Sequence, residues 1–128
     1  TKYNAQKVQG KAFNKGKDKR TGKATEVYHS IPNINGFEIV NKTGLRNPRT
    51  VQYFTTAESE GKYHPTQKPK ELMKYFINTY TDENDVVLDN TMGSGTTCLA
   101  SKELNRFFVG IEKDKQYYEI AVSRVCCS

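Results

Sequence analysis

The sequence predicts an α/β fold in which parallel strands alternate with helices and a ligand site lies at the strand ends. Three observations carry this prediction. An apolar run at residues 86–88 ends at Asp89, a loop with Gly93 and Gly95 follows, and a second apolar run occupies residues 107–111. A strand that ends in a Gly-x-Gly turn and continues into a helical pattern is typical of nucleotide-type sites in doubly wound sheets.

The second half is expected in the order helix, strand, helix, strand, helix. Apolar residues at helical spacing over residues 72–80 predict a helix that packs on the sheet, so core packing rather than ligand contact is their expected role. Residues 96–104 predict the helix after the glycine loop. Residues 117–125 give the last helix an apolar face, and Asp114 is its expected cap.

The first half has a different pattern. Short β-like pieces at residues 26–28, 37–40 and 50–54 alternate with Asn, Gly and Pro turns. We therefore expect a basic, β-rich region at residues 1–60 and an α/β half at residues 61–128.

The chemistry of the glycine loop indicates its ligand. Gly93 and Gly95 let the backbone turn sharply and approach a ligand, because neither has a Cβ. The helix that follows presents unpaired amides, which favour an anionic group. Asp89 would repel a pyrophosphate, so a ligand with both a carboxylate and a cation fits better. S-adenosylmethionine is such a ligand.

The sequence matches neither the phosphate-loop motif nor the dinucleotide-binding motif. A phosphate loop needs a lysine that is absent between Asn90 and Ser101, and Cys98 replaces the third glycine of the dinucleotide pattern. Glu112, at the end of the second strand, is placed to bond ribose hydroxyls. The alternative is that Glu112 only caps the next helix.

The segment HPTQKP at residues 64–69, LDNTMGSGTT at residues 88–97 and LNRFFVGIE at residues 104–112 occur in this order, with helices after each. This arrangement, over about residues 47–125, resembles the C-terminal part of bacterial and phage DNA amino-methyltransferases of restriction-modification systems. The resemblance implies a Rossmann-like S-adenosylmethionine-dependent methyltransferase fold, incomplete in this chain. It also implies methyl transfer to the exocyclic amino group of a flipped base, with adenine expected in preference to cytosine.

In that family the HPTQKP segment and the glycine loop together surround S-adenosylmethionine. The resemblance therefore assigns cofactor binding to His64, Thr66, Gln67, Lys68, Asp89, Asn90, Thr91, Gly93, Ser94, Gly95, Thr96, Thr97 and Glu112. Thr66 and Gln67 are expected to close over the methionine end. Asn90 stands where the family usually has proline, and we expect little change in loop shape because asparagine tolerates turn conformations.

The family's catalytic element, an Asp/Asn/Ser-Pro-Pro-aromatic loop, has no counterpart here. The prolines are Pro32, Pro48, Pro65 and Pro69, none adjacent to another. We expect no catalytic residue in this chain and a catalytic remainder on a missing segment or a separate chain. Two other interpretations are a non-enzymatic remnant that binds DNA or S-adenosylmethionine, and a dehydrogenase-like domain, which Asp89 disfavours.

A formal net charge of +6 and a pI of about 9.2 suit a polyanionic partner. The resemblance implies that this partner is double-stranded DNA and that the basic, β-rich region at residues 1–60 takes part in target recognition. DNA contact is expected from Lys15, Lys17, Lys19, Arg20, Arg46 and Arg49. The alternatives are a solvated basic tail for the first four, and pairing with surface carboxylates for the last two.

The three cysteines form no disulfide framework, and no apolar run is long enough to cross a bilayer. We therefore expect a cytoplasmic protein, and the resemblance implies a bacterial or phage-infected cell. His29 and His64 lie far from any Cys-x-x-Cys spacing, so no metal site is expected.

Overall fold

The computed structural model describes residues 2–17 and 38–127, which belong to two compact units. Unit 1 comprises Thr1–Gln6 and Arg49–Ser128, and unit 2 comprises Lys7–Pro48. In sequence, therefore, unit 2 is inserted into unit 1.

The expected division into residues 1–60 and 61–128 does not coincide with these units. The amide of Asn4 donates to the carbonyl of Thr79 over 2.7 Å, which attaches the start of the chain to unit 1. Residues 49–60 also belong to unit 1. The difference arises because long-range contacts, and not local composition, define a compact unit.

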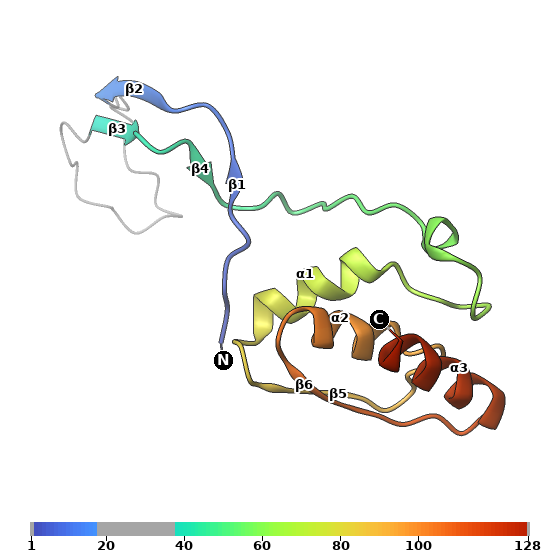
Figure 1. The fold of residues 1–128 in the computed structure, drawn as a ribbon. Helices are drawn as coiled ribbons and strands as arrows, with labels where there is room; N and C mark the ends of the chain where they lie inside the picture. Colours follow the sequence, from blue (N-terminus) through green and yellow to red (C-terminus); the bar gives the residue numbers. More distant parts are fainter. Residues whose placement is uncertain (1, 18–37, 128) are drawn as a thin grey trace, which may run out of the picture. The chain divides into compact units, whose positions relative to one another are not determined.

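Unit 1 is built on two parallel strands, β5 (Val86–Asp89) and β6 (Phe107–Gly110), which pair residue by residue from first to last. The helix α2 (Thr96–Glu103) connects them, with α1 (Lys70–Tyr80) before and α3 (Lys115–Cys126) after. All three helices lie on one side of the two strands (Figure 1). The predicted order of helix, strand, helix, strand, helix is confirmed.

The core of unit 1 is centred on α2, which packs against both strands and both other helices. Small side chains on α2 allow this close approach: Ala100 and Ser101 are fully buried. The buried apolar residues of the described chain are Ile77, Cys98, Leu99, Ala100, Ala121 and Val125. The core is therefore a layer between the helices and one face of the sheet.

Side chains outside the helices satisfy the unpaired amides at two helix starts. The Asp114 carboxylate accepts from the amides of Gln116 and Tyr117 over 2.8 and 3.1 Å, which confirms it as the cap of α3. The Glu60 carboxylate accepts from the amide of Lys70 over 2.8 Å at the start of α1.

The segment before α1 is extended but forms no strand. Residues 50–54 were expected as a strand, and this expectation is wrong for the described chain, because they find no partner strand there. The Phe54 ring instead meets the Tyr75 ring edge-on, at 5.7 Å between centroids. A 3-10 helix, η1 (Ala57–Glu60), follows. The strand expected at residues 26–28 lies outside the described residues.

Unit 2 consists of antiparallel pairs. The strand β1 (Val8–Gln9) pairs with β4 (Leu45–Arg46), and β2 (Phe13–Lys17) pairs with β3 (Glu38–Asn41). The strand expected at residues 37–40 corresponds to β3.

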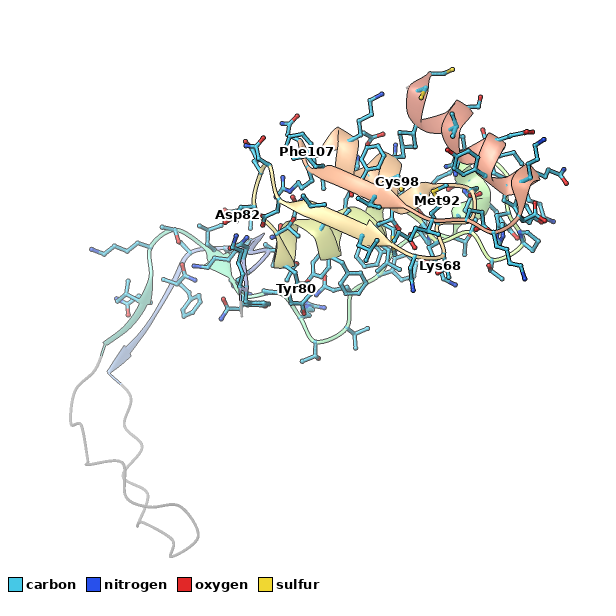
Figure 2. The ribbon with its side chains drawn as sticks, turned by 90° about the horizontal axis from the view of Figure 1, so that it is seen from below. Lys68, Tyr80, Asp82, Met92, Cys98 and Phe107 are labelled. Carbon is cyan, nitrogen blue, oxygen red and sulfur yellow. The ribbon has the colours of Figure 1, made fainter. Side chains whose placement is uncertain are left out.

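The second face of the β5–β6 sheet is apolar and exposed. Val86 and Leu88 are 64% and 65% exposed, and Phe107 and Val109 are 63% and 49% exposed. Figure 2 views unit 1 from this face, with the helices behind the strands. Within the described part of the chain no helix is long and apolar enough to cross a bilayer.

Candidate cofactor-binding site

A cavity of about 430 Å³ lies where the HPTQKP segment meets the ends of β5 and β6 and the start of α2. It is lined by His64, Thr66, Gln67, Lys68, Met73, Asp89, Thr91, Met92, Gly93, Ser94, Thr96, Thr97 and Glu112. A volume of this size is typical of sites for small molecules and cofactors.

The cavity brings together all the residues predicted to bind the cofactor except Asn90 and Gly95. Asn90 is exposed beside the loop, and Gly95 is buried beneath it. Sequence reasoning missed Met73 and Met92 as lining residues. Met73 was expected only to pack in the core, but it lies in the first turn of α1, where its amide donates to the carbonyl of Pro69. Its proximity to the HPTQKP segment was the available signal.

The two glycines of the loop have different roles. Both have positive φ, 51° at Gly93 and 76° at Gly95. A Cβ on Gly93 would lie 3.4 Å from the His64 ring, whereas a Cβ on Gly95 would lie 2.9 Å from the Cβ of Ala121. Gly93 faces the cavity, but Gly95 allows the start of α2 to pack against α3. The expectation that both glycines serve ligand approach therefore needs correction at Gly95.

Glu112 connects the ends of the two strands. Its Oε2 accepts from the amide of Gly93 over 2.8 Å, and its Oε1 accepts from the amides of Lys113 and Asp114. The backbone hydrogen bonds from Asp114 and Gly93 hold the pKa of the Glu112 carboxyl below its usual range. Glu112 is therefore ionised at neutral pH, and since Asp114 caps α3, Glu112 has a separate role in holding the loop.

Asp89 occupies the end of β5, just before the glycine loop. Its Oδ1 accepts from the amide of Thr91 over 3.1 Å. Each carboxylate oxygen offers two acceptor sites, so both acids retain capacity for further hydrogen bonds. Two carboxylates thus line one cavity without a cation paired to either in the described part of the chain.

The HPTQKP segment begins as a tight turn that packs on α3. The amide of Gln67 donates to the carbonyl of His64, and the amide of Thr66 lies 3.2 Å from His64 Nδ1. The His64 ring meets the Tyr117 ring edge-on, at 4.2 Å between centroids. Gln67 accepts from the amide of Tyr63 through its Oε1. The contact with α3 therefore helps to hold this turn beside the cavity that His64 and Gly93 both line.

The residues predicted to contact DNA are distributed over both units, and two of them lie outside the described residues. Lys15 and Lys17 belong to β2, while Lys19 and Arg20 lie outside the described residues. Arg46 lies in unit 2, and Arg49 lies in unit 1.

Arg46 and Arg49 both have neighbours within the described part of the chain. Arg46 lies 5.6 Å from the centre of the Phe13 ring and donates to the carbonyl of Lys11 over 3.2 Å. Arg49 lines an open surface beside Tyr53 and Phe54. Neither arginine pairs with a carboxylate among the residues described, contrary to the alternative raised above.

A parallel α/β sheet with a glycine loop after one strand, and an acid at the end of each strand, defines a nucleotide-type or S-adenosylmethionine-type binding protein. Residues 1–123 match the N6/N4 family described as DNA methylase, and the chain belongs to this family. Family membership confirms the predicted resemblance and removes the dehydrogenase-like interpretation.

The named relatives of the chain are type II methyltransferases, in agreement with the family match. The chain is 45% identical over 86 residues to the type II methyltransferase M.HindIII of Haemophilus influenzae, covering 67% of this chain and 28% of that protein. It is 39% identical over 79 residues to M.BglII of Bacillus subtilis, covering 59% of this chain and 22% of that protein. The matched stretch thus spans about a quarter of the length of these curated relatives.

A solved structure confirms the fold class. The crystal structure of the M1.HpyAVI complex with S-adenosylmethionine superposes with a TM-score of 0.55 and 42% sequence identity. The match covers 62% of this chain and 42% of that one. The α/β methyltransferase fold, present here in part, is therefore confirmed.

Proposed function

We propose that this chain is the cofactor-binding portion of a site-specific DNA methyltransferase and that its cavity holds S-adenosylmethionine. One observation carries the proposal: a single cavity joins the HPTQKP segment, the glycine loop and the acids at both strand ends. The bound cofactor supplies a methyl group on a sulfonium, which is activated for transfer to a nitrogen nucleophile. Eleven of the thirteen residues assigned from the family resemblance, all except Asn90 and Gly95, line the cavity and are the proposed contacts.

The residues in the cavity fit this cofactor. Asp89 and Glu112 provide negative charge for a ligand that carries two cationic groups. Gln67 lines the same cavity, and its Nε2 is buried without a hydrogen-bond partner among the described residues. A buried, unpaired donor is costly, and the cofactor's carboxylate would satisfy it. In this proposal Glu112 binds the ribose hydroxyls while its existing bonds hold the loop.

The first prediction concerns the affinity of the chain for S-adenosylmethionine. Calorimetric titration should give saturable binding that is weakened about tenfold to a hundredfold by Glu112→Ala, because a charged hydrogen-bond acceptor is lost. The matched control is Glu119→Ala, which removes an acid on α3 that is 65% exposed in its side chain and lies outside the cavity. Preference for NAD over S-adenosylmethionine, or equal affinity in the two variants, would contradict the proposal.

We also propose that the whole enzyme methylates an exocyclic amino group, of adenine rather than cytosine, after base flipping. The catalytic Pro-Pro-aromatic loop would come from the remainder of the enzyme. The exposed apolar face of β5 and β6 supports such a remainder, because parallel sheets are normally covered on both faces. A non-enzymatic remnant is the second candidate, favoured only by the absence of adjacent prolines.

Unit 2 is the proposed DNA-contacting and partial target-recognition part. Its sequence contains nine Lys or Arg residues and three Asp or Glu residues, whereas unit 1 contains eleven of each. Unit 2 therefore carries the whole formal net charge of +6. A charge concentrated in one unit is expected of a surface that follows the phosphate backbone.

The second prediction follows from this charge. Replacing Lys15, Lys17, Lys19 and Arg20 with glutamine should weaken duplex binding and reduce the slope of log affinity against log salt by up to about 3.6, since each contacted phosphate contributes about 0.9. A control variant with Lys62, Lys113 and Lys115 replaced by glutamine removes cations from unit 1. An unchanged slope in the first variant would show that these residues form a solvated tail.

A further inference from the structure

Arg124, near the end of α3, joins three segments that are far apart in sequence. Its Nη1 donates to the carbonyl of Ser94 over 2.6 Å and to Ser94 Oγ over 2.9 Å. The same atom lies 3.4 Å from Thr96 Oγ1. The guanidinium also lies 4.4 Å from the centre of the Tyr63 ring. One side chain thus contacts the glycine loop, the start of α2 and the residue before the HPTQKP segment.

The loop residues that Arg124 contacts are among the most buried in the chain. Ser94 is 2% exposed and Thr96 is 6% exposed, and both residues line the cavity. Burial lowers the pKa of the Arg124 guanidinium, while the nearby Glu60 and Tyr63 act in the opposite direction. Arginine nevertheless stays charged, so a partly buried cation is retained against the glycine loop. Such a cation is retained only where its hydrogen bonds and ring contact offset the cost of desolvation.

The alternative explanations for an arginine here are weak. Arg124 is not on the exposed face of α3 that carries Lys115 and Glu119, which form a solvent-exposed pair. It also does not line the cavity, so direct contact with a cofactor is not indicated. Its hydrogen bonds nevertheless end on Ser94 and Thr96, which are residues of the cavity wall.

We propose that Arg124 is a positioning residue for cofactor binding. It holds Ser94 of the glycine loop, and Tyr63 before the HPTQKP segment, at fixed distances from α3. It thereby sets the separation between the two walls of the cavity that the glycine loop and the HPTQKP segment form. His64, next to Tyr63, is held on the same helix by Tyr117. The inference rests on the proposed function, because the loop it positions is the proposed S-adenosylmethionine loop.

The chemistry of the guanidinium predicts how substitutions will rank. Methionine keeps the aliphatic stem but leaves the Ser94 carbonyl without this donor. Lysine keeps a cation, yet an ammonium is a point charge and cannot reproduce the planar contact with the Tyr63 ring. The expected order of affinity for S-adenosylmethionine is therefore wild type, then Arg124→Lys, then Arg124→Met.

The third prediction is tested with Arg124→Met, Arg124→Lys and the control Lys115→Met, which removes an exposed cation from the same helix. Calorimetry well below each unfolding midpoint should show at least about tenfold weaker binding of S-adenosylmethionine for Arg124→Met, partial recovery for Arg124→Lys and no change for Lys115→Met. NMR spectra without cofactor should show shifted amide resonances at Ser94 and Gly95 only in the Arg124 variants.

The outcomes separate the two proposals. If Arg124→Met unfolds at a lower temperature but binds S-adenosylmethionine as tightly as wild type while folded, the residue is merely structural and the positioning role is overturned. If the wild-type chain does not bind S-adenosylmethionine, the proposed function fails, and the amide shifts then report only whether Arg124 orders the loop. Tyr63→Leu, against Tyr63→Phe, tests the ring contact in the same way.

Discussion

No methyl transfer to DNA is expected from this chain alone, even with S-adenosylmethionine saturating. Placement of the acceptor nitrogen and electrostatic stabilisation supply most of the rate of such a reaction, and their loss costs several orders of magnitude. The sequence contains no adjacent prolines to form the family's catalytic loop. The fourth prediction is therefore a rate at the background of tritiated methyl incorporation into mixed-sequence DNA.

Activity should appear when a polypeptide that carries the Pro-Pro-aromatic loop is added. This polypeptide would cover the apolar face of β5 and β6, so Leu88→Lys, at a position 65% exposed, should prevent the recovery while leaving S-adenosylmethionine affinity unchanged. Glu119→Lys on α3 is the control. Nucleoside analysis of the product distinguishes methylation of adenine from methylation of cytosine. Incorporation by the chain alone would refute the assignment of catalysis to a remainder.

The fifth prediction is that Gly95→Ala lowers the free energy of unfolding by about 2–5 kcal/mol. A left-handed backbone costs an L-residue about 1–2 kcal/mol, and the new Cβ, 2.9 Å from the Cβ of Ala121, adds about 1–3 kcal/mol of overpacking. The midpoint of thermal unfolding should fall by at least about 8 °C for a unit of this size. Urea denaturation followed by circular dichroism measures the change.

Gly93→Ala is the matched control, because its φ is also positive but its Cβ would lie 3.4 Å from the His64 ring, at ordinary contact distance. We expect it to cost only about 1–2 kcal/mol, the backbone term alone. Combining Gly95→Ala with Ala121→Gly should give a loss about 1–2 kcal/mol smaller than the sum of the single losses, since the clash is relieved. Strict additivity, or equal losses at the two glycines, would refute a packing role for Gly95.

Local patterns in the sequence predict the three α-helices and the two parallel strands of unit 1 and, in the cavity wall, Asp89, Gly93 and Glu112. The apolar run ending at Asp89 predicts β5 to the residue, and the pattern around Asp114 predicts that this residue caps α3. These features are predictable because strand alternation, helical spacing and capping depend on residues within one or two turns. HPTQKP and the glycine loop were placed together only through the family resemblance.

Only the tertiary structure decided which residues from distant segments of the sequence contact one another. It attached residues 2–6 to the end of α1, left residues 50–54 without a strand partner, and made Glu112 hold the amide of Gly93. It also brought Arg124 into hydrogen-bond contact with Ser94 of the glycine loop. No local pattern encodes these features. The hydrogen bonds join residues that are nineteen or more positions apart, and a strand at residues 50–54 would depend on a partner strand. Their geometry follows from how the helices pack on the sheet.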